Sequence, residues 1–238
     1  MIVRFKEGDR IECGVLSDNL IETLDGDECC LEDVELLAPV EPSKVICVGL
    51  NYTEHARELN MDLPEEPIIF LKPPSTVIGP GADIVIPSAS REVDYEGELA
   101  VVIGKRSRNV TASEAEDRIL GYACFNDVTA RDLQRKDGQW TRAKSFDTFA
   151  PLGPGIVPVD PADLKIETRV NGTVRQSSRT SDLIFSVPEL VEFISGIMTL
   201  VPGDVIATGT PPGVGSLHGG DVVEVEIEGL GVLQNQVR

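Results

Sequence analysis

The sequence has few basic residues for its length. Its 21 lysines and arginines stand against 40 aspartates and glutamates, which gives a formal net charge of −19 and a pI near 4.4. Because there is no basic patch to neutralise phosphates, we do not expect the chain to bind nucleic acid. A uniformly acidic, lysine-poor surface stays hydrated in concentrated salt. We therefore predict a halophilic protein, the alternative being an acidic protein of an ordinary cytoplasm.

Cysteine and long apolar runs are also scarce. The five cysteines are odd in number and form no C-x-x-C pair, which argues against a disulfide framework and a cysteine-based zinc site. No apolar run approaches the ~18 residues of a membrane helix, and the N-terminus lacks the apolar core of a signal peptide. These features predict a cytoplasmic protein that does not bind membranes.

Three common functional motifs are missing. The chain has no G-x-x-x-x-G-K-[ST] phosphate loop, no G-x-G-x-x-G dinucleotide fingerprint and no G-x-S-x-G nucleophile elbow. The last absence argues against a serine-triad esterase. The glycine-rich stretch "ATGTPPGVG" (207–215) matches none of them, but its backbone amides and Thr210 are suited to a small anion.

The patterns that are present predict an α+β protein dominated by strands. Helical spacing is confined to residues 53–59, 111–121 and 186–200, whereas short apolar or alternating runs recur along the rest of the chain. The order lacks the βαβα rhythm of a doubly wound sheet. The two prolines of "PVEPSK" predict a boundary between a small N-terminal β module, residues 1–41, and a main domain, residues 42–238.

The stretch "REVDYEGELAVVIG" (91–104) combines a buried-strand pattern with alternating acids. The acids that would share one face of the strand are Glu92, Asp94, Glu96 and Glu98. The simplest interpretation is a face exposed to water. Two features favour a buried site instead: Gly97 suits a place where another group comes close, and the apolar run that follows predicts burial on both faces. Neighbouring buried carboxylates need a cation, and Mg²⁺ prefers such oxygen ligands.

A further carboxylate, Asp127, opens a polar segment after an apolar run and is the candidate third metal ligand. If residues 127–134 are helical, Asp127, Arg131 and Gln134 lie on one face. The alternative for Asp127 and Arg131 is a helix cap with a surface ion pair.

Histidine is rare, with only His55 and His218 present. His55 and Glu58 are one turn apart on the predicted helix, an arrangement that orients a general base; the alternative is a chance pair on an exposed helix. His218 lies in a turn and is interpreted as structural. Lys144 lies between segments that contain aromatic residues and proline, where a partly buried ammonium suits an oxyanion or a substrate carboxylate.

Long blocks of the chain resemble the fumarylacetoacetate hydrolase family. They include "VGLNYTEHARE", "VDYEGELAVVIGK", "GYACFNDVTARDLQ", "TRAKSFDTFAPLGP", "VNGTVRQ" and "LVPGDVIATGTPPGVG", in the family's order over about residues 42–238. The resemblance implies a mixed β-sandwich roll with few helices, and a homodimer. It implies Mg²⁺ or Mn²⁺ bound by Glu96, Glu98 and Asp127, and a catalytic lid pair of His55 and Glu58. It also implies pocket residues, which are Lys72, Arg131, Gln134, Lys144 and Thr210.

The resemblance further implies a reaction. We expect hydrolysis of a carbon–carbon bond in an acylpyruvate-like 2,4-diketo acid, in aromatic or amino-acid breakdown. His55, oriented by Glu58, would activate water. Lys144 and Gln134 would steady the developing charge and the substrate carboxylate. The alternatives are a 2-hydroxyhepta-2,4-diene-1,7-dioate isomerase, a decarboxylase of its precursor 5-oxopent-3-ene-1,2,5-tricarboxylate, and an oxaloacetate decarboxylase. A metal-binding scaffold without activity is the alternative from another class.

Overall fold

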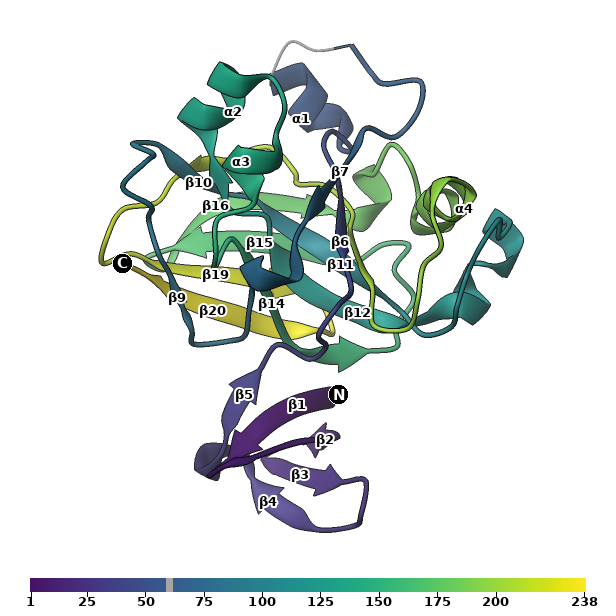
Figure 1. The fold of residues 1–238 in the computed structure, drawn as a ribbon, viewed down its shortest axis with the longest axis vertical. Helices are drawn as coiled ribbons and strands as arrows, with labels where there is room; N and C mark the ends of the chain where they lie inside the picture. The colour runs from purple at the N-terminus through teal and green to yellow at the C-terminus, as the bar shows by residue number, and fades with distance from the viewer. Residues whose placement is uncertain (59–61) are drawn as a thin grey trace.

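The computed structural model describes residues 1–58 and 62–238 (Figure 1). Five short strands lie at the N-terminal end: β1 (Ile2–Glu7), β2 (Arg10–Ser17), β3 (Leu20–Thr23), β4 (Glu28–Cys30) and β5 (Glu35–Leu37). They enclose a small core that contains Val3, Phe5 and Ile21. Figure 1 shows this unit apart from the body, which it joins where Ile2 pairs with Ile156. The division of the chain at residue 41 stays a prediction.

The largest sheet of the body carries the residues of the candidate site. In spatial order its strands are β14 (Ala150–Val157), β12 (Ile119–Asn126), β11 (Gly97–Ile103), β17 (Val205–Ala207), β6 (Val45–Val48) and β7 (Ile69–Lys72). Neighbours are antiparallel except for β17 and β6, and β8 (Val77–Ile78) pairs in parallel with β14. Strand β11 is buried along its whole length, as its apolar run predicts.

A second sheet packs against the first. Its strands are β16 (Thr173–Arg179), β15 (Lys165–Val170), β19 (Val222–Ile227), β20 (Gly231–Val237) and β9 (Asp83–Ile84). One core cluster holds side chains from both sheets, including Leu99, Val101, Ile166 and Val225. A third, small sheet joins β13 (Thr129–Ala130), β10 (Val93–Tyr95) and β18 (Gly215–Ser216). The prediction of a strand-dominated α+β fold with mixed sheets is confirmed.

The α-helices of the described residues are α1 (Thr53–Glu58), α2 (Arg131–Asp137), α3 (Thr141–Lys144) and α4 (Val187–Ile197). Figure 1 shows α1, α2 and α3 gathered at one end of the body, beside β7 and β10. Helix α4 begins with a capping box, in which the side chain of Ser186 accepts from the backbone amide of Glu189 and the side chain of Glu189 accepts from that of Ser186. The helix buries its apolar face. No helix among the described residues is long and apolar enough to cross a membrane.

Two predicted helices differ from the structure. The helix predicted over residues 111–121 has the expected N-terminal cap, because Thr111 and Glu114 form a capping box. Only the short 3₁₀ turns Ala112–Glu114 and Glu116–Arg118 follow this cap. The apolar residues after them pair with β11 and β14 as strand β12, which runs through Gly121. The helix expected over residues 127–134 begins only at Arg131, after β13. In both places long-range strand pairing outweighs local helical signals.

Candidate active site

Three buried carboxylates meet where β11 begins and β12 ends. One carboxylate oxygen each from Glu96, Glu98 and Asp127 lies within 4.8 Å of the others, and all three residues are buried. The backbone amide of Asp127 donates a 2.8 Å hydrogen bond to the carbonyl of Glu96, which fixes the two segments against each other. Asp127 thus comes from the end of a strand, where the sequence analysis considered a helix.

Gly97 lies between the two glutamates because there is no room for a side chain. A Cβ atom at this position would overlap Thr168 Oγ1 on the neighbouring sheet. The prediction that another group approaches Gly97 is therefore correct. The sheets close tightly here, and that closure keeps Glu96 and Glu98 away from water, so the interpretation of a water-exposed acidic face is wrong for these two residues.

Two buried lysines contact the carboxylates. Lys144 Nζ donates hydrogen bonds to Glu96 Oε2 at 2.8 Å and to Asp127 Oδ2 at 2.6 Å. Lys72 Nζ donates to Asp127 Oδ1 and, at 3.1 Å, to the carbonyl of Val128. Burial by itself would lower the pKa of Lys144, but Asp127 and Glu96 raise that pKa above its ordinary value. Lys144 is therefore a fixed positive charge at neutral pH.

Arg131, at the start of α2, forms the outer side of the cluster. Its Nε donates to Asp94 Oδ2 at 2.8 Å, another nitrogen donates to Glu96, and Nη1 donates to Gln134 Oε1 at 2.6 Å. The side chain of Arg131 is 21% exposed to solvent. Among the described residues no hydrogen bond engages the amide nitrogen of Gln134, so it is free to meet a substrate oxygen.

Glu98 differs from Glu96 in its surroundings. Burial disfavours the charged form of both, but Lys144 and Arg131 outweigh it at Glu96 and hold the pKa of Glu96 at about 2. Burial, followed by the negative charges of Asp127 and Glu96, raises the pKa of Glu98 well above its ordinary value. Within the described chain the Glu98 carboxylate accepts one hydrogen bond, from the Gly209 amide at 2.8 Å.

These residues fit a divalent cation. The donor set is three hard carboxylate oxygens of the kind that Mg²⁺ and Mn²⁺ prefer. One Glu98 oxygen has no partner in the described chain, and no lysine or arginine there forms a salt bridge with the Glu98 carboxylate. The nearest charges that act on it include those of Asp127 and Glu96, which are negative. Such an arrangement of like charges is unfavourable unless a cation completes it.

The predicted His55–Glu58 pair forms on α1. His55 Nδ1 lies 3.0 Å from Glu58 Oε2, which leaves Nε2 unengaged by this contact. His55 is 7% exposed, in contrast to the exposed helix that the alternative interpretation assumed. The Gly213 amide lies 3.3 and 3.4 Å from the two Glu58 oxygens. The pair thus touches loop 208–213, whose Gly209 touches Glu98.

Gln176 joins the same loop to the carboxylates, and the sequence analysis gave it no role. Its Oε1 accepts from the Gly97 amide at 3.0 Å, and its Nε2 donates to Thr210 Oγ1 at 2.8 Å and to the Pro211 carbonyl at 2.7 Å. Thr210 in turn donates to the Gly97 carbonyl at 2.9 Å. The only sequence signal was the position of Gln176 in "VNGTVRQ". His218 is separate from this network and is exposed.

A family model, fumarylacetoacetate (FAA) hydrolase C-terminal, matches residues 44–238. A protein of Bos taurus named mitochondrial oxaloacetate tautomerase FAHD2A is 50% identical over 219 residues, which is 86% of this chain and 70% of that protein.

Solved structures of enzymes are also similar to this chain in sequence and fold. A 5-carboxymethyl-2-hydroxymuconate delta-isomerase from Mycobacterium smegmatis is 46% identical with a TM-score of 0.94, covering 99% of this chain and 98% of that one. A maleylpyruvate hydrolase from Sphingobium sp. SYK-6, solved with manganese(II) ion and pyruvate, is 31% identical with a TM-score of 0.86, with the same coverage.

Proposed function

This chain belongs to the fumarylacetoacetate hydrolase family, a family of enzymes, and we propose that it is a divalent-metal-dependent enzyme acting on 2-keto and 2,4-diketo acids. The observation that carries the proposal is the buried set of Glu96, Glu98 and Asp127 beside Lys144 and Arg131. A divalent ion held by these carboxylates would supply positive charge that stabilises negative charge on the keto-acid oxygens.

The balance of charge supports an anionic substrate. Four carboxylates, those of Asp94, Glu96, Glu98 and Asp127, lie with three cationic side chains, those of Lys72, Lys144 and Arg131. With all seven groups ionised, the site carries one net negative charge, and a bound dication would make it positive. The negative charge of an organic acid would then meet a site of positive charge. The free amide of Gln134 and the partly exposed Arg131 are the groups for the substrate carboxylate.

For Lys72 and Thr210 we propose a positioning role in place of the substrate contact that the family resemblance implies. Lys72 is completely buried behind Asp127, and the Thr210 hydroxyl is engaged by Gly97 and Gln176. We assign both to positioning: Lys72 holds Asp127, and Thr210 holds loop 208–213. Lys144, which is charged and faces two of the carboxylates, is the cation that steadies charge developing on the substrate.

The His55–Glu58 pair favours hydrolysis of a carbon–carbon bond. Glu58 fixes the ring of His55 through Nδ1, so that Nε2 is available to take a proton from water. The water then attacks the distal carbonyl of a 2,4-diketo acid, and the pyruvate half leaves with its charge beside Lys144.

A second candidate, tautomerisation or isomerisation of a 2-keto dicarboxylic acid, is favoured by two of the comparisons. The relative at 50% identity is named an oxaloacetate tautomerase, and the structure at 46% identity is titled an isomerase. The same groups serve this reaction, with His55 Nε2 exchanging a proton with the substrate carbon and no water attacking.

Side-by-side assays separate the two candidates. Fumarylpyruvate cleavage, oxaloacetate enol–keto conversion, oxaloacetate decarboxylation and isomerisation of the dienedioate are each measured with Mg²⁺, with Mn²⁺ and in excess EDTA. Hydrolysis is supported if fumarylpyruvate gives the largest metal-dependent kcat/KM. A larger value for the tautomerase or isomerase reaction rejects hydrolysis as the main activity. Turnover that survives excess EDTA contradicts the metal-dependent site itself.

A further inference from the structure

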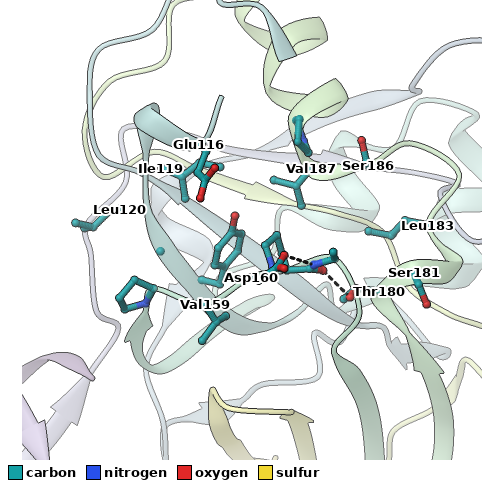
Figure 2. A pocket seen from close by; sticks show the side chains of 16 residues that line it. Glu116, Ile119, Leu120, Val159, Asp160, Thr180, Ser181, Leu183, Ser186 and Val187 are labelled. Carbon is teal, nitrogen blue, oxygen red and sulfur yellow. Dashed lines mark hydrogen bonds between the residues drawn. The ribbon is translucent and has the colours of Figure 1, made fainter. Parts of the chain in front are cut away.

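A second cavity lies away from the carboxylates, beside the N-terminal end of α4. Its volume is about 950 Å³, which is within the range of small-molecule sites. It lies between the start of β12, residues 158–162 and residues 180–188, and none of its lining residues belongs to the candidate active site. Figure 2 shows Glu116 and Ile119 on one side of it, Asp160 and Val159 below, and Leu183 and Val187 opposite.

Tyr122 is the unusual residue of this cavity. It is only 5% exposed, and among the described residues no hydrogen bond engages its hydroxyl. The hydroxyl faces the cavity, so a ligand that enters meets a hydrogen-bonding group without a partner in the described chain. Burial, with the negative charges of Glu116 and Asp160, raises the pKa of Tyr122 to about 12, so the group stays a neutral phenol.

The charges around Tyr122 are of one sign. Glu116 and Asp160 are exposed at the cavity, and neither forms an ion pair within the described part of the chain. Asp160 Oδ1 accepts one hydrogen bond, from the Ala162 amide at 3.0 Å, and its other oxygen has no partner there. The remaining walls include the apolar side chains of Ile119, Val159, Leu183 and Val187. Three hydroxyl residues also line the cavity, and their hydroxyls donate to other groups of the described chain: Thr180, Ser181 and Ser186. The two carboxylates repel anions, and a purely apolar ligand displaces water from Tyr122, Glu116 and Asp160 without replacing the hydrogen bonds of that water.

We propose that this cavity is a second ligand site, for a small organic cation that carries a primary ammonium on an aliphatic stem. The stem lies between the apolar walls, and the ammonium donates to the Tyr122 hydroxyl oxygen and to the Glu116 and Asp160 carboxylates. The ring of Tyr122 adds a favourable surface for the cation. The site is independent of the metal-dependent reaction proposed above.

Titration calorimetry with hexylammonium chloride tests the site on the full chain in low salt. We expect saturable one-to-one binding in the millimolar range, as suits a ligand of this size. Hexanoate, with the same stem and the opposite charge, is expected not to bind, and 1-hexanol is expected to bind more weakly. Absence of saturable hexylammonium binding, or equal affinity for hexanoate or 1-hexanol, overturns the proposal.

Three variants distinguish this cavity from general attraction of cations to an acidic protein. Y122F removes only the hydroxyl and is expected to weaken hexylammonium binding about tenfold, and E116Q about threefold. E192Q is the matched control, since Glu192 is an exposed acid on α4 that does not line the cavity and its loss changes net charge equally. Binding that is unchanged in Y122F, or lowered as much by E192Q as by E116Q, places the cation elsewhere and overturns the proposal.

Discussion

The side-chain oxygen of Gln176 accepts a 3.0 Å hydrogen bond from the backbone amide of Gly97, the residue between two of the candidate metal ligands. Gln176 is fully buried and its amide nitrogen bonds loop 208–213, so its side chain bridges that loop and the start of β11, beside the direct bonds from Thr210 and Gly209. The carboxylate set and the loop that touches Glu58 therefore depend on a residue of the opposite sheet.

Replacing Gln176 with leucine is expected to weaken Mn²⁺ binding about tenfold and to lower the free energy of unfolding. The Gly97 amide and the Pro211 carbonyl would be left buried without partners, at a cost of about 1–3 kcal/mol each. Calorimetric Mn²⁺ titration and urea unfolding measure the two effects. Gln236→Leu, on an exposed position of β20, is the matched control. Wild-type Mn²⁺ affinity in Gln176→Leu would show that the bridge does not support the site.

Glu98→Gln is expected to abolish Mn²⁺ binding while leaving the metal-free protein at least as stable as wild type. The three carboxylates lie within 4.8 Å of one another, so removing one charge relieves repulsion when no cation is present. Thermal unfolding in EDTA and Mn²⁺ titration report the two quantities separately. A control is Glu92→Gln, because Glu92 bonds Arg135 outside the set. A metal-free Glu98→Gln protein that is clearly less stable than wild type would contradict the expected repulsion.

Lys72→Met is expected to act on stability first. It leaves the Asp127 charge with one fewer cation in a fully buried place, and breaking a buried pair costs about 3–5 kcal/mol. Because a bound cation replaces the missing charge, Mn²⁺ should restore more stability to this variant than it adds to wild type. Urea unfolding with EDTA and with Mn²⁺ makes the comparison. A variant of normal stability whose only defect is a raised KM would instead support the sequence-based role of Lys72 as a substrate contact.

The acidic composition predicts a response to salt. With a net charge of −19, the folded chain repels itself in dilute buffer, and screening by KCl reduces that repulsion. The urea midpoint is therefore expected to rise steadily from low to molar KCl. A neutral solute at equal osmolality is the control, because it does not screen charge. A midpoint that KCl leaves unchanged would count against the halophilic interpretation.

The sequence predicts those parts of the molecule whose signals are local. The alternation in β19, the helical spacing in α4 and the acids around Gly97 all have meaning within a few residues, and the structure contains each of these features. Residues 111–121 were assigned wrongly because their helical cap is local, whereas the strand that follows is stabilised by partners far along the chain. Gln176 was missed for the same reason, since its contact with Thr210 spans 34 residues.

The His55–Glu58 pair allows hydrolysis and tautomerisation to be distinguished by mutation. His55→Ala is expected to lower kcat of carbon–carbon cleavage by about 10²–10⁴, because the proton of the attacking water then has no positioned acceptor. Its effect on tautomerisation should be smaller, since solvent can exchange a proton with an activated carbon. Glu58→Gln should reproduce part of the loss, because the amide holds the ring of His55 less firmly.

Mn²⁺ affinity should stay unchanged in both variants, since neither residue belongs to the carboxylate set. Glu54→Gln is the matched control, because Glu54 lies on the same helix and its side chain bonds the exposed Arg57, with no other side-chain partner in residues 1–58 and 62–238. The measurement is the ratio of kcat values for fumarylpyruvate cleavage and oxaloacetate tautomerisation in each variant. Equal losses in the two reactions would mean that His55 moves the same proton in both, and the water-activating role would have to be abandoned.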